Sequence, residues 1–346
     1  MSKENSLAAS ANKKPDSYDQ IIALAALFEG DFSIDWIVEL AQCKVSKVIA
    51  ALEEAVNDKR LVQRGAGIYC FDDNASRSNL QQHFDASQRQ EFINQIAELM
   101  IRDLPDGEDK ALIVSQHLLQ TKNDLVRCRV LSKAGDKFLS TFNTQEAFRC
   151  YDKVLQDLRT LSGKEVDDLF TDTAIKYSKI STGRQNTSSV ITTLKDARKR
   201  AVDQKNASAE ALLDMHIAKN EWLRAGYASA MTHFNRGWSK AGELDDPKLK
   251  RAATIFGTFF LYWQGRFREA VASYENAVHD VEKFPQGRFP LLAAITLGYC
   301  YTQIGQVTQG LGMIDAIRTL CLERGDLNLA AYTAGNMGSI MLDIQM

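Results

Sequence analysis

The sequence predicts a mainly α-helical protein in which hairpins of two helices stack into a solenoid behind a small N-terminal domain. The first observation is a repeat of about 40 residues, in which the segment 263–270 returns as 303–310. The second is that Thr258, Gly298 and Gly338 keep the same step. A fixed period of this size indicates stacked helical hairpins, because each hairpin buries its apolar face only against its neighbours. The third is the scarcity of proline and of Asn-Gly or Asp-Gly turns, which argues against a β architecture.

The composition is that of a soluble folded protein, with 346 residues of which 45% are hydrophobic and 25% charged. The net charge of −2 gives no strongly basic character, and no run of 18 apolar residues predicts a membrane span. Because the N-terminus is polar and lacks an apolar signal core, we expect a cytoplasmic protein with no membrane partner. The six cysteines are scattered without a C-x-x-C pair, so we expect them to be reduced and buried.

Three short helices are predicted near the N-terminus. An apolar pattern with helical spacing begins at Tyr18 and stops at Gly30. Ser33 is expected to cap a second helix and Ser46 a third, because a serine side chain accepts a hydrogen bond from the first turn.

A β-hairpin is predicted to follow these helices. The β-prone runs 61–64 and 68–71 flank the loop Gly65-Ala66-Gly67. Three helices followed by a hairpin form the winged-helix arrangement. The predicted regions are a disordered tail at 1–15, a winged-helix domain at 16–75, a linking helical pair at 86–124 and a repeat solenoid at 125–346.

Only helical periodicity is found after residue 86. The predicted pairs are 87–102 with 109–121, 131–138 with 147–154, 165–181 with 187–204, 209–224 with 228–241, 249–264 with 267–283 and 290–304 with 307–323. Residues 327–346 give one further first helix without a partner, so the last repeat is incomplete. A natural solenoid usually ends in a polar cap, and we therefore expect the sequence to belong to something longer.

These repeats resemble tetratricopeptide repeats in their longer-helix variant. Small residues recur where paired helices approach closely: Gly135 and Ala147, Ala270 and Ala277, and Gly298 and Gly310. Large apolar residues occupy the packing positions: Leu131, Phe138, Tyr151, Phe267, Tyr274, Leu297 and Tyr301. The resemblance covers residues 125–346 and is weak at 165–241. The step exceeds the usual family period of 34 residues, and no proline ends each repeat.

The order of winged helix, helical pair and long repeats also resembles the arm that follows the nucleotide-binding module of STAND-type signal-transduction ATPases, the large bacterial regulators. The segments 117–120, 133–136 and 145–151 are typical of that junction. The resemblance implies that the winged helix packs on an ATPase and that the repeats receive an inducer or partner. The ATPase itself is missing here, because no G-x-x-x-x-G-K-[ST] loop occurs.

The sequence offers little for catalysis. The five histidines are far apart, no H-E-x-x-H occurs and no Cys/His cluster has zinc spacing. His216 and His233 are close enough in sequence to face one another across a hairpin, but satisfied core or surface histidines are the simpler interpretation. We therefore expect a protein that is not an enzyme and has no metal or cofactor.

DNA is an unexpected partner on charge grounds. Residues 16–73 carry five basic against eleven acidic side chains, a net charge of −6. A DNA reader needs several phosphate contacts, and only Lys44 and Lys47 lie where a recognition helix would begin. We expect a winged helix that docks on protein.

The concave surface of the solenoid is the predicted binding site. On the tetratricopeptide pattern, its inner side carries Asn220, Arg224, Phe259, Tyr262, Trp263, Tyr299 and Gln303, with His216, Ile255 and Ile295 beside them. Aromatic side chains supply contact area at low entropic cost, while Asn and Arg bind a peptide backbone or carboxylate. The alternative is that the aromatic rings simply fill wide spaces between long helices.

Two functions fit these observations. The first is an interaction and sensor arm of a bacterial signalling or transcriptional regulator, which binds a protein, a peptide or a small inducer in the groove. The second is a self-contained, peptide-sensing transcription factor whose N-terminal domain binds DNA. The oligomeric state stays open.

Overall fold

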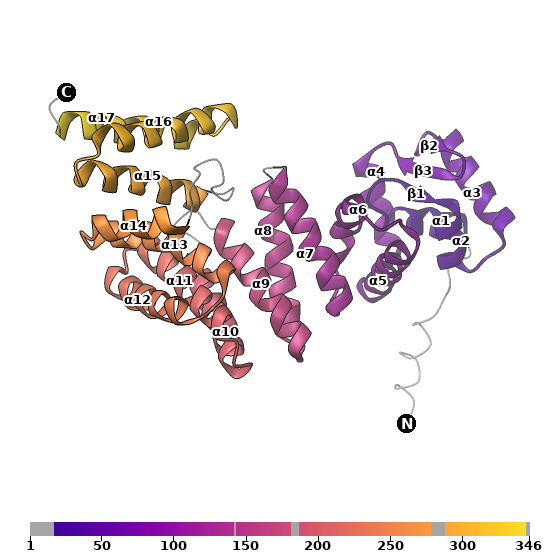
Figure 1. Cartoon of the computed structure of the whole chain (residues 1–346). Helices are drawn as coiled ribbons and strands as arrows, with labels where there is room; N and C mark the ends of the chain where they lie inside the picture. The colour runs from indigo at the N-terminus through magenta and orange to yellow at the C-terminus, as the bar shows by residue number, and fades with distance from the viewer. Residues whose placement is uncertain (1–16, 142, 181–186, 278–287, 344–346) are drawn as a thin grey trace. The chain divides into compact units, whose positions relative to one another are not determined.

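The computed structural model describes residues 17–141, 143–180, 187–277 and 288–343. The chain divides into two compact units, residues 1–161 and 162–346 (Figure 1). The predicted disordered tail and the predicted ends of two helices, at 278–283 and 344–346, lie outside the described residues. Within the described part of the chain, no helix is both long and apolar enough to cross a bilayer.

The first unit begins with three helices and a small antiparallel sheet. Its elements are α1 (Tyr18–Ala25), β1 (Phe32–Ser33), α2 (Ile34–Ala41), α3 (Val45–Asn57), β2 (Leu61–Gly65) and β3 (Ile68–Phe71). The predicted helices and hairpin are confirmed, but the short strand β1 was missed; it pairs with β3, so the strand order is β1-β3-β2. Two residues are too few to give a period-2 signal.

The predicted cap of α2 is confirmed and that of α3 is wrong. The Ser33 hydroxyl accepts a hydrogen bond from the Asp35 N–H at 3.2 Å. The third helix starts two residues earlier than predicted, so Lys44 is the N-cap residue and Ser46 lies inside the first turn. Lys44 makes no side-chain cap hydrogen bond.

The rest of the first unit is helical. Its elements are α4 (Asn74–Leu80), the 3-10 helix η1 (Gln81–His83), α5 (Ala86–Asp103), α6 (Glu108–Leu118), α7 (Leu125–Ser140) and α8 (Thr144–Leu158). The fully buried His117 accepts a hydrogen bond from the Glu29 N–H at 3.4 Å, which ties α6 to the end of the first helical segment. Gly135 lies against the ring of Tyr151, as the small-residue pattern predicts.

The second unit consists of α-helices that alternate as first and second members of hairpins. They are α9 (Lys164–Ile180), α10 (Thr187–Asp203), α11 (Ala207–Leu223), α12 (Tyr227–Glu243), α13 (Pro247–Trp263), α14 (Phe267–Ala277), α15 (Arg288–Gln303), α16 (Val307–Glu323) and α17 (Leu327–Asp343). The degenerate pair predicted at 165–181 and 187–204 is present as two packed helices, α9 and α10. The turns after α13 and α15 place Gly265 and Gly305 in the left-handed region, with φ of 70° and 92°.

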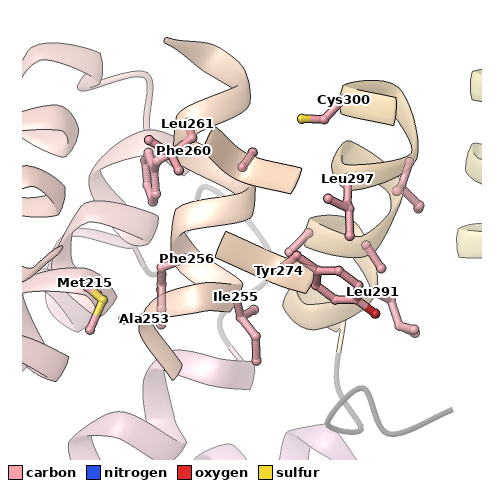
Figure 2. Close-up of a cluster of buried hydrophobic side chains, with 14 of the residues drawn as sticks. Met215, Ala253, Ile255, Phe256, Phe260, Leu261, Tyr274, Leu291, Leu297 and Cys300 are labelled. Atoms are coloured by element: carbon pink, nitrogen blue, oxygen red, sulfur yellow. The ribbon is translucent and has the colours of Figure 1, made fainter. Parts of the chain in front are cut away.

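Small residues let the paired helices of the second unit approach closely. A methyl group on Gly298 would lie 2.8 Å from Ile314 Cδ1 and 3.0 Å from the Gly310 carbonyl oxygen, so the backbones of α15 and α16 almost touch. Between the hairpins a continuous apolar core runs from Met215 through Phe256 and Phe260 to Leu297 and Cys300 (Figure 2). Stacking therefore buries apolar side chains that a single hairpin would leave exposed.

Candidate functional site

The first helices of the hairpins form one side of the second unit. Along the described chain, α11 contacts α9 and α13, α13 contacts α15, and α15 contacts α17. The second helices pack mainly on the first helices before and after them. Elements that touch their counterparts in neighbouring repeats lie on the tighter, inner side of a curved stack. The inner side is therefore built from α9, α11, α13, α15 and α17.

An aromatic array, defined as Trp222, Phe259, Tyr262, Trp263 and Tyr299, crosses three of these helices. The Trp222 ring lies 5.8 Å from Phe259 and 5.1 Å from Trp263, measured between ring centroids. Tyr262 lies 5.1 Å from Trp263 and 5.8 Å from Tyr299. Tilted and edge-to-face contacts at these distances stabilise each ring beyond the area that it buries. Trp263 remains 52% exposed, while the other four rings are partly buried.

Four of the seven predicted groove residues belong to this array, and the other three do not. The Arg224 guanidinium donates to Glu221 at 2.6 Å, a contact on a different side of α11. Asn220 is fully buried, whereas Gln303 is exposed. Ile255, Ile295 and His216, which were placed on the same side, are buried.

Sequence reasoning missed one member of the array, Trp222, and one neighbour, Asn336. Trp222 contacts Phe259 and Trp263 of the array and also the ring of Phe260. Its position 40 residues before Tyr262 was the available signal. The Tyr299 hydroxyl donates to Asn336 Oδ1 of α17 at 2.9 Å, which fixes the ring at the far end of the array.

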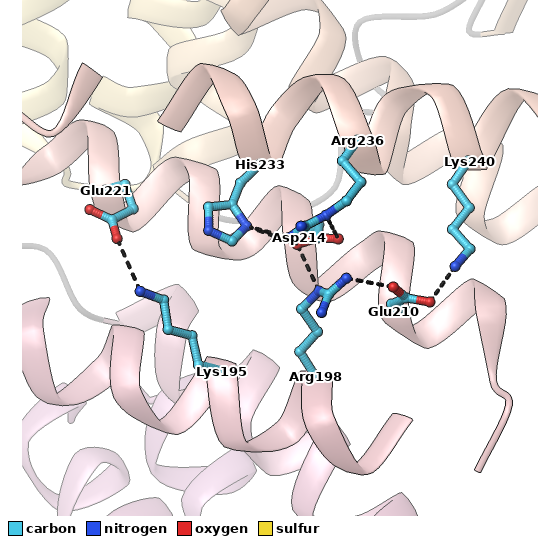
Figure 3. A network of polar contacts seen from close by, with 8 residues as sticks. All are labelled: Lys195, Arg198, Glu210, Asp214, Glu221, His233, Arg236 and Lys240. Carbon is cyan, nitrogen blue, oxygen red and sulfur yellow. Dashed lines mark hydrogen bonds and ion pairs between the residues drawn. The ribbon is translucent and has the colours of Figure 1, made fainter. Parts of the chain in front are cut away.

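The opposite side of α11 carries an acidic stripe that is neutralised from both flanking helices (Figure 3). Its members are Glu210, Asp214 and Glu221, and the basic partners are Lys195, Arg198, His233, Arg236 and Lys240. Burial raises the pKa of Asp214, but hydrogen bonds from His233, Arg236 and Arg198 outweigh burial and lower that pKa to about 2. The bonds that this carboxylate accepts from Arg198 of α10 and from His233 and Arg236 of α12 link α11 to both flanking helices.

A second group lies where α11 faces α9 and α13, and we call it the inner polar cluster. It consists of His216, Lys219 and Asn220 of α11 and Ser178 of α9. The Lys219 ammonium donates to the Ser178 carbonyl oxygen at 2.7 Å, and His216 Nδ1 lies 2.9 Å from the Ser178 hydroxyl. Burial lowers the pKa of Lys219 to about 7 and that of His216 well below its usual value. His216 and His233 thus serve different sides of α11.

Two further features of the described residues bear on a metal site and on a small-molecule pocket. No set of three or more His, Cys, Asp or Glu side chains in the described residues has the geometry to hold a metal ion. A polar hollow of about 690 Å³ lies at one end of the α9–α10 and α10–α11 junctions, lined by Gly163, Asp167, Gln204 and Asn206 among others. None of its lining residues belongs to the array or to the inner polar cluster.

Comparison with solved structures supports the fold. A STAND-type signal transduction ATPase with a tetratricopeptide repeat sensor, from Pyrococcus horikoshii, superimposes with a TM-score of 0.53 at 13% identity. The match covers 95% of this chain, and the chain spans 48% of the length of that protein. The fold is thus a tetratricopeptide-like α-solenoid.

Two further solved structures give weaker matches. The Rap conjugation regulator of plasmid pLS20 with the Phr* peptide has a TM-score of 0.45 at 13% identity, covering 71% of this chain and 73% of its own. A Rap protein with competence and sporulation factor has a TM-score of 0.41 at 11% identity, covering 95% and 96%. No protein-family model and no curated protein sequence matches the chain.

Proposed function

We propose that this chain is a regulatory interaction module that binds an extended segment of a partner protein or a peptide across the aromatic array, and that it performs no catalysis. The observation that carries the proposal is the exposure of Trp263 in the middle of five contacting rings. A tryptophan filling space between helices is expected to be buried, whereas Trp263 presents half of its surface to solvent. Tyr227, 4.7 Å from Trp222, extends this accessible aromatic surface and is 54% exposed.

An extended ligand suits this surface better than a small inducer. The rings come from α11, α13 and α15, so together they follow the direction of stacking over three repeats. Tryptophan and tyrosine dominate the energetics of peptide and protein interfaces because they bury a large area at low rotamer cost. A segment lying along the array makes a contact in each repeat, and its binding favours one curvature of the stack.

For the N-terminal elements we propose a winged helix that docks on protein. Val45 and Ile49 are 53% and 37% exposed on α3, the third helix, which reads DNA in a DNA-binding winged helix. Apolar side chains at this position, together with the net charge of −6 over residues 16–73, favour a protein surface over phosphate. The proposal makes the chain the sensor arm of a STAND-like bacterial regulator, an assignment that goes beyond the fold that the neighbour shares. DNA binding by a self-contained regulator is the second candidate, for which Lys44 and Lys47 remain the basis.

The test is selection of ligands from a displayed library of random dodecapeptides, followed by fluorescence anisotropy with the selected peptides. Trp263→Ala should weaken binding by about 30-fold, the loss of one interface hot spot, with unchanged helical circular dichroism. Leu322→Ala is the matched control, because Leu322 is 47% exposed on the second helix α16. Equal affinities for Trp263→Ala and wild type, or a failure to select any peptide, would contradict the proposal.

A further inference from the structure

The inner polar cluster contains a buried amine without a counter-charge. Lys219 is 4% exposed, and within the described residues its ammonium makes no ion pair with a carboxylate. The nearest charge that acts on it is another cation, Lys179. An ammonium has three protons to donate, and the described part of the chain supplies one acceptor, the Ser178 carbonyl. Most of the hydrogen-bonding capacity of this buried amine is therefore unused within the described residues.

A second incomplete group lies next to it on the same helix. The Asn220 amide nitrogen donates to the His216 carbonyl oxygen at 2.9 Å, which fixes the orientation of the amide. Its other atom, Oδ1, is buried and has no hydrogen-bond partner among the described residues. Buried polar atoms are almost always paired, so an orphaned amide oxygen calls for a donor from elsewhere.

The cluster is continuous with the aromatic array. His216 lies 5.1 Å from Phe256, Phe256 lies 4.9 Å from Phe289, and Phe289 lies 5.4 Å from Phe259 of the array, between ring centroids. Phe289 also covers the ammonium of Lys219, at 5.7 Å from the ring centroid. This partly buried ring in the first turn of α15 therefore lies between the inner polar cluster and the aromatic array.

We propose that the inner polar cluster anchors one residue of the bound segment, with its carboxylate on the Lys219 ammonium and its backbone N–H on Asn220 Oδ1. Lys219 lacks acceptors and Asn220 Oδ1 lacks a donor within the described residues. A peptide residue that bears a carboxylate supplies both, because its carboxylate oxygens accept from an ammonium and its backbone N–H donates to an amide oxygen. The inference rests on the proposed function and specifies its ligand as an acidic peptide. The carboxylate belongs either to an Asp or Glu side chain or to the C-terminus of the segment.

The experiment uses the dodecapeptides selected on the wild-type chain, synthesised in matched sets. Each peptide is compared with versions in which one Glu or Asp is replaced by Gln or Asn, with a C-terminally amidated version, and with versions N-methylated at one backbone amide. Affinities are measured for wild type, for Lys219→Met and for the control Lys199→Met, which removes a charge from an exposed lysine of α10. A loss of affinity on replacing Glu or Asp by Gln or Asn identifies a side-chain carboxylate as the anchor. A loss of affinity on C-terminal amidation identifies the C-terminal carboxylate.

We expect one neutralisation to weaken binding to wild type by about 30-fold or more, as for a desolvated charge pair. The same neutralised peptide should bind the Lys219→Met variant as tightly as the unmodified peptide does. N-methylation of the peptide residue that carries the carboxylate should also weaken binding to the wild-type chain. Lys199→Met should behave as wild type. If peptides bind and no neutralised peptide loses affinity for the wild-type chain, the inference is wrong while the proposed function stands. This comparison uses only the wild-type chain, so it does not depend on the folding of a variant. If no peptide binds, both fall.

Discussion

Gly298→Ala tests the close approach of α15 and α16 on which the stack depends. A methyl group at this position would lie 2.8 Å from Ile314 Cδ1 and 3.0 Å from the Gly310 carbonyl oxygen. Ile314 is fully buried and the carbonyl belongs to the backbone, so displacing either group costs free energy. Overpacking costs about 1–3 kcal/mol, and the better helix propensity of alanine returns about 1 kcal/mol. We expect a net loss of about 1 kcal/mol in the free energy of unfolding of this hairpin.

Gly338→Ala is the matched control, because Gly338 keeps the same repeat step in α17 and a methyl group there would meet nothing within 4 Å. This variant should gain about 0.5–1 kcal/mol. Urea unfolding gives the global effect, and hydrogen exchange of α15 and α16 gives the local one, since a repeat array need not unfold as one unit. Equal stabilisation by the two substitutions would refute the close-packing argument.

Four further outcomes are expected. Because the pKa of Asp214 is held at about 2, its contribution is present above its ordinary pKa near 4 and is lost as pH falls toward 2. Asp214→Asn should therefore lower the free energy of unfolding by about 3 kcal/mol near neutral pH. The loss of stability of this variant on acidification should be smaller than that of wild type, as measured by urea unfolding at a series of pH values. Burial raises the pKa of Cys128, Cys150 and Cys300 to about 12, so at pH 8 a thiol-reactive dye should label the partly exposed Cys43 first and these three only after denaturation. Ala225→Gly should raise the melting temperature, because Ala225 adopts a φ of 66° where the later repeats have glycine, a strain of about 1 kcal/mol; an unchanged or lower value would contradict this. Finally, among the described helices α17 packs mainly on α15 and α16, whereas α15 also packs on α13 and α14, so the amides of α17 should exchange faster than those of α15; equal protection would contradict this.

The order of the repeats was predictable because the residues that enforce it are local. Glycines at the ends of first helices and small residues at helix crossings recur at a fixed step, and both are visible in the sequence. Strand β1 was not predictable, because its two residues pair with a partner, β3, that lies far along the chain. The start of α3 was misplaced since Lys44 occupies a position that serine would have filled by propensity.

The aromatic array was predictable in part and the inner polar cluster was not. Phe259, Tyr262 and Trp263 follow from the repeat register, because neighbouring first helices place equivalent positions side by side. Helix α11 is surrounded on all sides and carries charges on two of them, so its sequence shows no apolar face that would orient it. The unusual environment of Lys219 and Asn220 results from the carbonyl of Ser178 and from their burial. Both are features of the tertiary structure and are not visible in the local sequence.

Hydrogen exchange with and without a selected peptide tests the central claim, that the first helices of the stack form the recognition surface. The account predicts that bound peptide slows exchange at the C-terminal halves of α11 and α13 and in α15, with little change in α12, α14 and α16. Protection confined to those second helices, or to the first unit, would contradict it.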